Sequence, residues 1–177
     1  VIAEYTRPAR VVRDGSIVVV PAMSELHSID ANGREMEAFL TDGLRSLINV
    51  PANTMGEYTV RWPGHIQRYQ STELSPDELV DAWRLDPQRP EFTWMEVCVE
   101  GNGQVRTWTV EDEGMDGDSS MARTTGLVTF ACVVAWSQQE LFSEGIHPPE
   151  DLPSDVIHNV IQTLKDEGVR IEASVLS

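Results

Sequence analysis

The chain has 177 residues, of which 41% are hydrophobic and 24% are charged, and this is ordinary for a globular protein with a buried core. Its 29 acidic and 13 basic residues give a net charge of −16 at pH 7. That balance argues against nucleic acid and anionic membranes as partners, because both require a positively charged binding face.

The two cysteines, Cys98 and Cys132, lie in apolar sequence and show no CxxC or Cys/His spacing. This pattern predicts reduced, structural thiols, no metal site and a cytoplasmic protein. The longest apolar run, residues 127–136, is about half as long as a bilayer span requires, and residues 1–15 lack the apolar segment of a signal peptide. Because the first residue is Val and not Met, we expect a fragment with an N-terminal portion missing.

The first half of the chain predicts short strands joined by turns and short helices. Residues 11–20 read as a hairpin around Asp14-Gly15, and the polar residues 21–33 as a loop. Asp42 could cap a helix that runs to residue 48, although Gly43 weakens this prediction. Ser75, with Pro76 and Glu78, predicts a helix with a capping box that ends near residue 85, before Asp86-Pro87. The remaining elements expected in this half are strands at 35–39 and 55–60 and a helix at 66–70.

The second half predicts a hairpin and two helices. Strands at 92–99 and 105–111 flank the turn at 101–103. Residues 125–142 form a helix that is apolar nearly all round, which predicts burial on more than one side. An amphipathic helix at 153–167 and a strand at 169–175 complete the chain.

These elements predict the α+β class, with a mixed, largely antiparallel sheet and helices packed over one face. The chain contains no strand-GxGxxG-helix unit. Its nearest approach, at residues 101–103, is a hairpin turn and therefore the wrong context for a phosphate-binding loop.

Residues 59–65 concentrate the candidate chemistry at the end of a predicted strand. Arg61 offers a planar fork of donors that suits a carboxylate. Pro63 and Gly64 set a tight turn, and His65 can face whatever lies at its mouth. The residues alone therefore predict a pocket for an anion or a carboxylate.

Three blocks of sequence, in order, resemble the saccharopine dehydrogenase-like family, in particular its lysine 6-dehydrogenase branch. Residues 59–65 resemble the family's T-L-R-Y-P-G-H, and residues 37–47 its E-A-F-x-T-D-G-L-R-T-L. Residues 121–126, followed by residues 148–150, resemble its M-A-R-T-T-G and distal P-P-E.

The resemblance implies the C-terminal substrate-binding and dimerisation domain of an NAD(P)-dependent oxidoreductase that acts on the CH–NH group of an amino acid such as lysine or saccharopine. NAD or NADP would be bound mainly by a preceding nucleotide-binding domain, so we expect no cofactor and no activity in the isolated chain. Residues 1–120 would form the substrate-binding and oligomerisation sheet, and residues 121–177 would return toward the nucleotide-binding domain. Without that domain an apolar helix face would be left over, which predicts a homodimer.

Two other functions remain open: a non-catalytic interaction or structural domain on the same scaffold, and a related reductase that acts on a polyamine such as carboxynorspermidine. Two departures from the family bear on this choice. Trp62 stands where the family has Tyr and so removes a hydroxyl, and Leu127-Val128 stand where it usually has Pro two residues after the Gly.

The candidate substrate-binding and catalytic residues each have a simpler alternative. The resemblance implies that Arg61 binds a substrate carboxylate, with Trp62 beside it, whereas an arginine at a strand end is usually a solvated surface residue. His65 could help to remove a proton from the substrate amine before hydride leaves, or it could be a helix cap or packing residue.

Other candidate residues lie further from this stretch. Arg123, Thr124 and Thr125 could face the polar end of the substrate or the nicotinamide, or simply begin a helix. Asp42 could face the cleft between domains or act only as a cap. Glu37 and Glu57 would suggest a glycosidase-like pair only if they converge.

Overall fold

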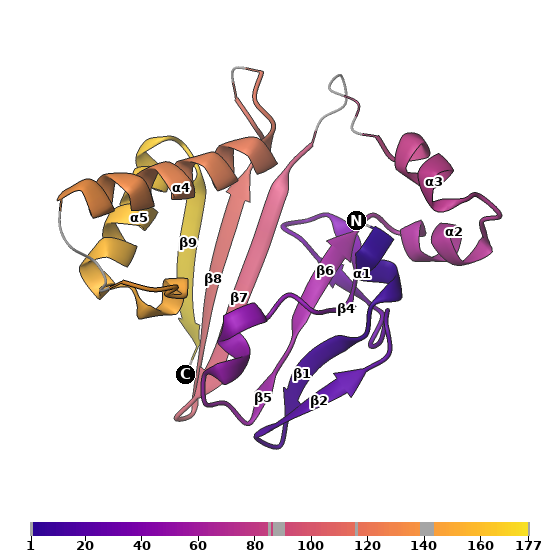
Figure 1. The fold of residues 1–177 in the computed structure, drawn as a ribbon, viewed down its shortest axis with the longest axis horizontal. Helices are drawn as coiled ribbons and strands as arrows, with labels where there is room; N and C mark the ends of the chain where they lie inside the picture. Colours follow the sequence, from indigo (N-terminus) through magenta and orange to yellow (C-terminus); the bar gives the residue numbers. More distant parts are fainter. Residues whose placement is uncertain (1, 85, 87–90, 116, 139–143, 177) are drawn as a thin grey trace. The chain divides into compact units, whose positions relative to one another are not determined.

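The computed structural model describes residues 2–84, 86, 91–115, 117–138 and 144–176. The chain forms two compact units, Val1–Leu85 and Asp86–Ser177. Within the described residues there are three antiparallel three-stranded sheets and five α-helices (Figure 1), which confirms the predicted α+β class.

The first sheet of unit 1 is built on the predicted hairpin. Strand β1 (Ala9–Arg13) pairs antiparallel with β2 (Ser16–Val20) and, on its other side, with β5 (Thr54–Met55). Asp14 and Gly15 both have positive φ, 49° and 71°, as the turn of a two-residue hairpin requires.

The second sheet has the order β3-β4-β6, with β3 at His27–Asp30, β4 at Glu35–Thr41 and β6 at Glu57–Arg61. The loop predicted over residues 21–33 was therefore wrong in part, because β3 pairs with β4. The strand predicted at 55–60 is divided at Gly56. A Cβ at that position would lie only 3.0 Å from Leu40 Cδ2, so a larger residue would have to displace this core side chain.

Short helices complete unit 1: α1 (Ile2–Thr6), the 3-10 helix η1 (Arg45–Asn49), α2 (His65–Ser71) and α3 (Pro76–Ala82). The predicted capping box is confirmed, since Ser75 accepts from the Glu78 amide and Glu78 accepts from Ser75. The cap predicted at Asp42 was wrong, and the helix predicted to run to residue 48 is the short 3-10 helix η1. Asp42 is engaged by Arg10 and leaves no side chain to cap η1, which begins three residues later.

The core of unit 1 lies between its sheets and helices as three small apolar clusters. The first one matters for the site, because Tyr5 of α1, Phe39 of β4 and Ile66 of α2 are buried together, with Tyr69 and Trp83 packed against them. The sheet and the short helices therefore meet at one aromatic cluster.

Unit 2 is a sheet of order β7-β8-β9 with two helices. It consists of β7 (Thr93–Gly101), β8 (Gln104–Asp112), α4 (Ser120–Gln138), the 3-10 helix η2 (Pro149–Asp151), α5 (Ser154–Asp166) and β9 (Arg170–Leu176). The predicted hairpin is confirmed, with Asn102 and Gly103 at φ 53° and 74° in its turn. Figure 1 shows α4 and α5 side by side against the sheet.

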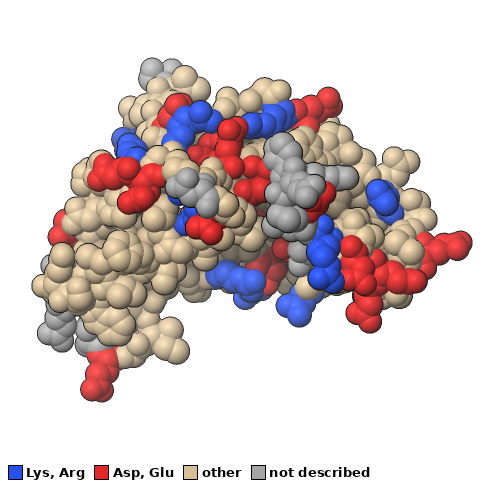
Figure 2. Space-filling view, turned by 90° about the horizontal axis from the view of Figure 1, so that it is seen from above, with Lys and Arg blue, Asp and Glu red and all other residues tan. Residues whose placement is uncertain are grey.

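Helix α4 departs from its prediction in two respects. It begins at Ser120, five residues early, while residues 139–142 of the predicted helix lie outside the described residues. It is also not buried on more than one side, because only Ser120 and Ala131 are buried. Phe130 and Trp136 are 60% and 72% exposed. Figure 2 shows a broad area of the surface without charged side chains. Among the described helices, none is both long and apolar enough to cross a bilayer.

Candidate functional site

Arg61 lies at the end of strand β6, directly opposite Glu37 of β4 in the antiparallel register. Each of the three nitrogens of its guanidinium has a partner within unit 1. Nε donates to the Tyr5 hydroxyl at 3.0 Å, Nη1 donates to the Val60 carbonyl at 2.9 Å, and Nη2 forms an ion pair with the Glu4 carboxylate. Arg61 thus already binds a carboxylate, and that carboxylate comes from helix α1.

Tyr5 connects Arg61 to His65. Its hydroxyl oxygen lies 3.0 Å from Nδ1 of His65 as well as 3.0 Å from Nε of Arg61. Because a guanidinium can only donate, the tyrosine oxygen accepts from Arg61 and its own hydrogen is available for Nδ1. The neutral form of His65 that fits this chain of hydrogen bonds carries its proton on Nε2.

The local backbone fixes the position of His65. Gly64 adopts φ 80°, a left-handed conformation that glycine reaches at little cost, and its amide donates to Glu37 Oε1 at 3.0 Å. The imidazole begins α2 and packs against Trp83, with ring centroids 4.4 Å apart, and against Tyr5 at 5.8 Å. The Pro63-Gly64 turn therefore places His65 in the aromatic cluster.

Burial dominates the titration of both rings. The pKa of His65 is lowered from its ordinary value, first by desolvation and then by the positive charges of Arg61 and Arg68, while Glu37 opposes the shift. The pKa of Tyr5 is raised by desolvation, although Arg61 partly counteracts it. At neutral pH the cluster therefore holds a neutral imidazole and a protonated phenol.

Glu37 brings to this cluster a buried carboxylate oxygen without a partner among the described residues. Its Oε1 accepts from the Gly64 amide, whereas Oε2 is buried and has no hydrogen-bond partner among the described residues. A buried carboxylate oxygen normally has a partner in a folded protein. This oxygen, Arg61 and His65 lie around the end of one pair of strands.

The structure places Trp62 just after β6, where the residue is 57% exposed. It follows Arg61 directly and its carbonyl accepts from the His65 amide at 3.1 Å, so its backbone belongs to the same turn. The proposed contact between Trp62 and a substrate stays a prediction.

Arg123, Thr124 and Thr125 belong to unit 2, in the first turns of α4. The Arg123 guanidinium pairs with Asp112 at 3.2 Å and donates to the Glu167 carbonyl at 2.7 Å, and the two paired side chains are only 12% and 4% exposed. The Thr124 hydroxyl donates to the Ser120 carbonyl. These contacts join α4 to β8 and to the end of α5, so they account for Arg123 structurally.

Asp42 lies elsewhere in unit 1. Arg10 engages it through Nε at 2.8 Å, Nη2 at 2.9 Å and the backbone amide at 3.1 Å. These hydrogen bonds from Arg10 lower the pKa of Asp42. They connect the end of β4 to β1 and do not bring Asp42 to the Arg61 cluster.

Glu37 and Glu57 do not form a glycosidase-like pair. Both lie on the same face of the sheet, since Glu37 is opposite Arg61 and Glu57 is opposite Thr41. Four residues of strand separate these positions, which is about 13 Å and too far for the two carboxylates to share a glycosidic bond. Glu57 instead accepts from the Thr41 hydroxyl and occupies the space beside Gly43 that a Cβ would need.

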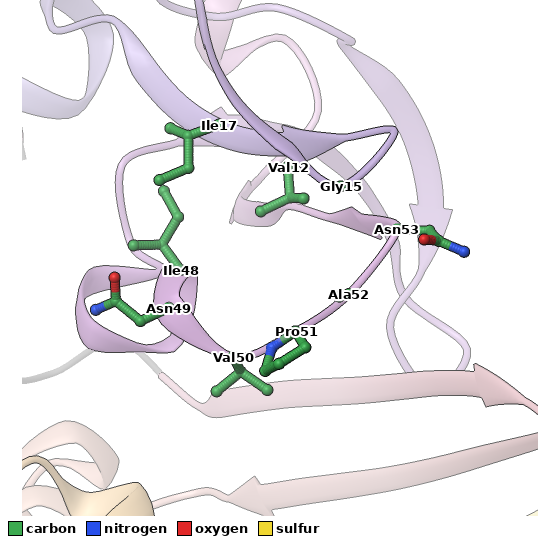
Figure 3. A pocket seen from close by; sticks show the side chains of 9 residues that line it. All are labelled: Val12, Gly15, Ile17, Ile48, Asn49, Val50, Pro51, Ala52 and Asn53. Atoms are coloured by element: carbon green, nitrogen blue, oxygen red, sulfur yellow. The ribbon is translucent and has the colours of Figure 1, made fainter.

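A pocket of about 750 Å³ lies at the turn of the β1-β2 hairpin and shares no residue with the Arg61 cluster (Figure 3). Its walls are mostly aliphatic, and Asn49 and Asn53 are its polar side chains; the others that line it are Val12, Gly15, Ile17, Ile48, Val50, Pro51 and Ala52. In Figure 3 the Asn53 side chain points away from the aliphatic residues. No charged or titratable group lines this pocket, so the candidate chemistry lies with Arg61.

The β7-β8 turn does not have the form of a dinucleotide-binding loop. Gly101 and Gly103 flank the β7-β8 turn, and the chain continues from that turn into β8 and not into a helix whose N-terminus could bind a pyrophosphate.

Sequence reasoning did not find Glu4 and Tyr5, the two residues of α1 that complete the cluster. Glu4 and Tyr5 stand 57 and 56 residues before Arg61, and no spacing rule joins a short N-terminal helix to a strand end at that separation. Glu37 was visible as the first residue of the second family-like block, but only the register of β4 with β6 shows that it faces Arg61.

The family model described as the Saccharopine dehydrogenase C-terminal domain matches residues 1–169, which cover all of unit 1 and most of unit 2. A search of curated proteins finds no match.

Proposed function

Because the chain belongs to the saccharopine dehydrogenase C-terminal domain family, we propose that it is the substrate-binding domain of an NAD(P)-dependent oxidoreductase. The reaction would be at the CH–NH group of an amino acid, with lysine and saccharopine as the first candidates. One observation carries the proposal: Arg61 is held at a strand end by Tyr5 and already binds a carboxylate.

The Glu4 carboxylate indicates what Arg61 is built to bind. An arginine fork prefers two donors on one carboxylate, and here Nη2 pairs with Glu4 while Nε is used by Tyr5. A substrate carboxylate would take the place of Glu4. Glu4 and Arg61 are 38% and 27% exposed, so this exchange would occur at the surface of unit 1.

His65 would accept a proton from the substrate amine. Since its pKa is lowered, the imidazole is neutral at pH 7 and able to accept a proton. Its Nδ1 faces the Tyr5 hydroxyl, so proton transfer would pass along the Tyr5–His65 hydrogen bond or through Nε2 after a change of tautomer. Tyr5 is thereby proposed as the residue that sets which nitrogen is basic.

A second function, that of an interaction domain, is favoured by helix α4. Its outward face carries Met121, Phe130, Val133 and Trp136, all exposed. Exposed apolar faces of this kind are typical of contact surfaces. We propose that this face mediates a homodimer, whether or not the domain also binds a substrate.

The test of the enzymatic proposal uses the complete protein that contains this chain. NAD(P)H absorbance is followed with lysine, saccharopine and a panel of amino acids and polyamines, comparing the parent with Arg61→Lys. Turnover of an amino acid together with a raised KM in Arg61→Lys supports the proposal. Turnover of polyamines alone favours the carboxynorspermidine-type alternative, and no turnover on the whole panel favours the interaction domain. Arg106→Lys is the control, since Arg106 lies exposed in β8.

A further inference from the structure

We propose that Glu37 is a further substrate-binding residue, whose Oε2 accepts a hydrogen bond from the α-ammonium group of the amino acid whose carboxylate binds Arg61. The inference rests on the function proposed above and narrows it. It states that the site takes zwitterionic α-amino acids in preference to simple carboxylates or diamines.

The register of the sheet places the two charges side by side. Glu37 and Arg61 are Cα partners in the β4-β6 ladder, so their side chains leave the same face of the sheet. Directly opposed residues in an antiparallel pair have Cβ atoms about 4.5–5.5 Å apart. In an α-amino acid the ammonium and the carboxylate are attached to one carbon, so they present opposite charges at a similarly short separation.

Glu37 and Arg61 do not neutralise each other in this structure. The three guanidinium nitrogens of Arg61 are directed to Tyr5, the Val60 carbonyl and Glu4. Within the described ranges, only Oε1 of Glu37 accepts a hydrogen bond, from the Gly64 amide at 3.0 Å. Because this anion and cation face each other without pairing, a zwitterionic ligand can contact both of them, with its carboxylate on Arg61 and its ammonium group on Glu37.

The second carboxylate oxygen of Glu37, Oε2, makes no hydrogen bond that would stabilise the fold among the described residues. Holding the Gly64 turn requires one acceptor, and an amide oxygen would provide it as well as a carboxylate. Oε2 is nevertheless buried without a partner, which costs free energy unless a donor arrives. An ammonium group supplies both a donor and the opposite charge, and therefore compensates more than a water molecule would.

The surrounding charges suit this exchange. Helix α1 contributes Glu4, α2 contributes His65 and Arg68, and β6 contributes Arg61. When a substrate carboxylate displaces Glu4 from Arg61, the charge on Arg61 stays compensated and Glu37 remains as the counter-charge for the ammonium group. His65 stays neutral and adds no competing cation beside Glu37.

The test is a comparison of two ligands in two proteins, with the 177-residue chain and titration calorimetry. L-lysine carries the carboxylate and the α-ammonium group, whereas 6-aminohexanoate lacks only the α-ammonium group. The variant is Glu37→Gln, whose amide oxygen can still accept from Gly64, and the matched control is Glu35→Gln, on the exposed start of the same strand. We expect Glu37→Gln to lower the affinity for L-lysine by about tenfold or more and to leave the affinity for 6-aminohexanoate unchanged. Glu35→Gln should change neither affinity.

Two results would overturn the proposal. Equal weakening of both ligands in Glu37→Gln would assign Glu37 to the turn alone. Equal affinity of the parent for L-lysine and Nα-acetyl-lysine would show that the α-ammonium group does not contribute to binding. This measurement needs no variant, so it tests the proposal even if Glu37→Gln does not fold.

The same titrations separate this proposal from the one on which it rests. If Arg61→Lys leaves L-lysine binding unchanged, or if neither ligand binds the parent, the carboxylate site itself is absent and both proposals fail. If Arg61→Lys weakens both ligands but Glu37→Gln does not discriminate between them, only the α-ammonium contact fails.

Discussion

The Tyr5 hydroxyl lies 3.0 Å from Nδ1 of His65, although 60 residues separate the two in the chain. The same oxygen accepts from Nε of Arg61. A five-residue helix therefore sets both the position of the arginine and the tautomer of the histidine.

Replacing Tyr5 with Phe tests that coupling. The buried ring stays, but Arg61 Nε loses an acceptor and His65 Nδ1 loses a donor, which we expect to cost about 1–3 kcal/mol of unfolding free energy. Since the lost hydrogen bond favours the neutral imidazole, the pKa of His65 should rise. An NMR titration of the His65 ring measures this, with Tyr58→Phe as control because Tyr58 donates to Glu25 instead. A pKa of His65 that stays unchanged in Tyr5→Phe would contradict the assigned hydrogen bond.

His65 should make unit 1 less stable in mild acid. Its folded pKa lies below the unfolded value of about 6.5, because burial and two arginines disfavour the imidazolium. Below pH 6.5 the unfolded chain therefore takes up the proton first, and the stabilisation present above that pH is lost as the pH falls through the folded pKa. Urea unfolding between pH 5 and 7.5 should show this loss in the parent and a smaller one in His65→Gln. Identical pH profiles for the two proteins would show that His65 does not contribute.

Glu4→Gln should strengthen the binding of carboxylate ligands. The change removes the charge that occupies Arg61 and leaves the guanidinium available to a ligand. We expect 6-aminohexanoate to bind several-fold more tightly, by calorimetry at low ionic strength, where such contacts are least screened. Glu35→Gln removes an equal charge from the start of β4 and provides the comparison. Weaker binding in Glu4→Gln would mean that Glu4 orients Arg61 and does not compete for it.

Arg123→Met should destabilise unit 2. The substitution leaves Asp112, which is 4% exposed, as a buried charge without its partner and frees the Glu167 carbonyl. Breaking a buried ion pair on one side typically costs about 3–5 kcal/mol. Thermal or denaturant unfolding would measure the loss against Arg106→Met, because Arg106 is an exposed residue of β8. A small loss of stability combined with weaker substrate binding would instead favour the substrate-binding role that the family resemblance implies.

The outward face of α4 gives a prediction for assembly. Exchanging Phe130 and Trp136 for Ser should shift the chain toward monomer in sedimentation at high concentration, because both rings are exposed and their loss leaves the packed side of α4 intact. Val80→Ser, an exposed apolar position on α3, should leave the sedimentation profile unchanged. A parent that sediments as a monomer at every concentration would exclude a homodimer.

The elements predicted correctly from the sequence were those whose signal lies within a few neighbouring residues. Asp14-Gly15 and residues 101–103 predicted hairpins from turn preferences alone, and Ser75 with Glu78 predicted a helix start. Each of these signals is complete within a few residues, so no distant contact could override it.

The predictions that were wrong concern residues whose contacts lie far away in the sequence. Asp42 has the composition of a helix cap, yet the guanidinium and amide of Arg10 compete for its carboxylate from 32 residues away. The apolar character of α4 predicted burial on more than one side, but composition does not say how many neighbours a helix has. The candidate site shows the same limit, since Arg61 and His65 could be predicted from one stretch and Tyr5 could not.

The Arg61–Glu4 pair has one more consequence. A helix of five residues is too short to persist by itself, so α1 depends on the burial of Tyr5 and on the Arg61–Glu4 pair. A ligand that takes Glu4's place removes one of these two anchors. Ligand binding at Arg61 and order at the N-terminus would then oppose each other, so loosening of residues 2–6 would report that a carboxylate has replaced Glu4.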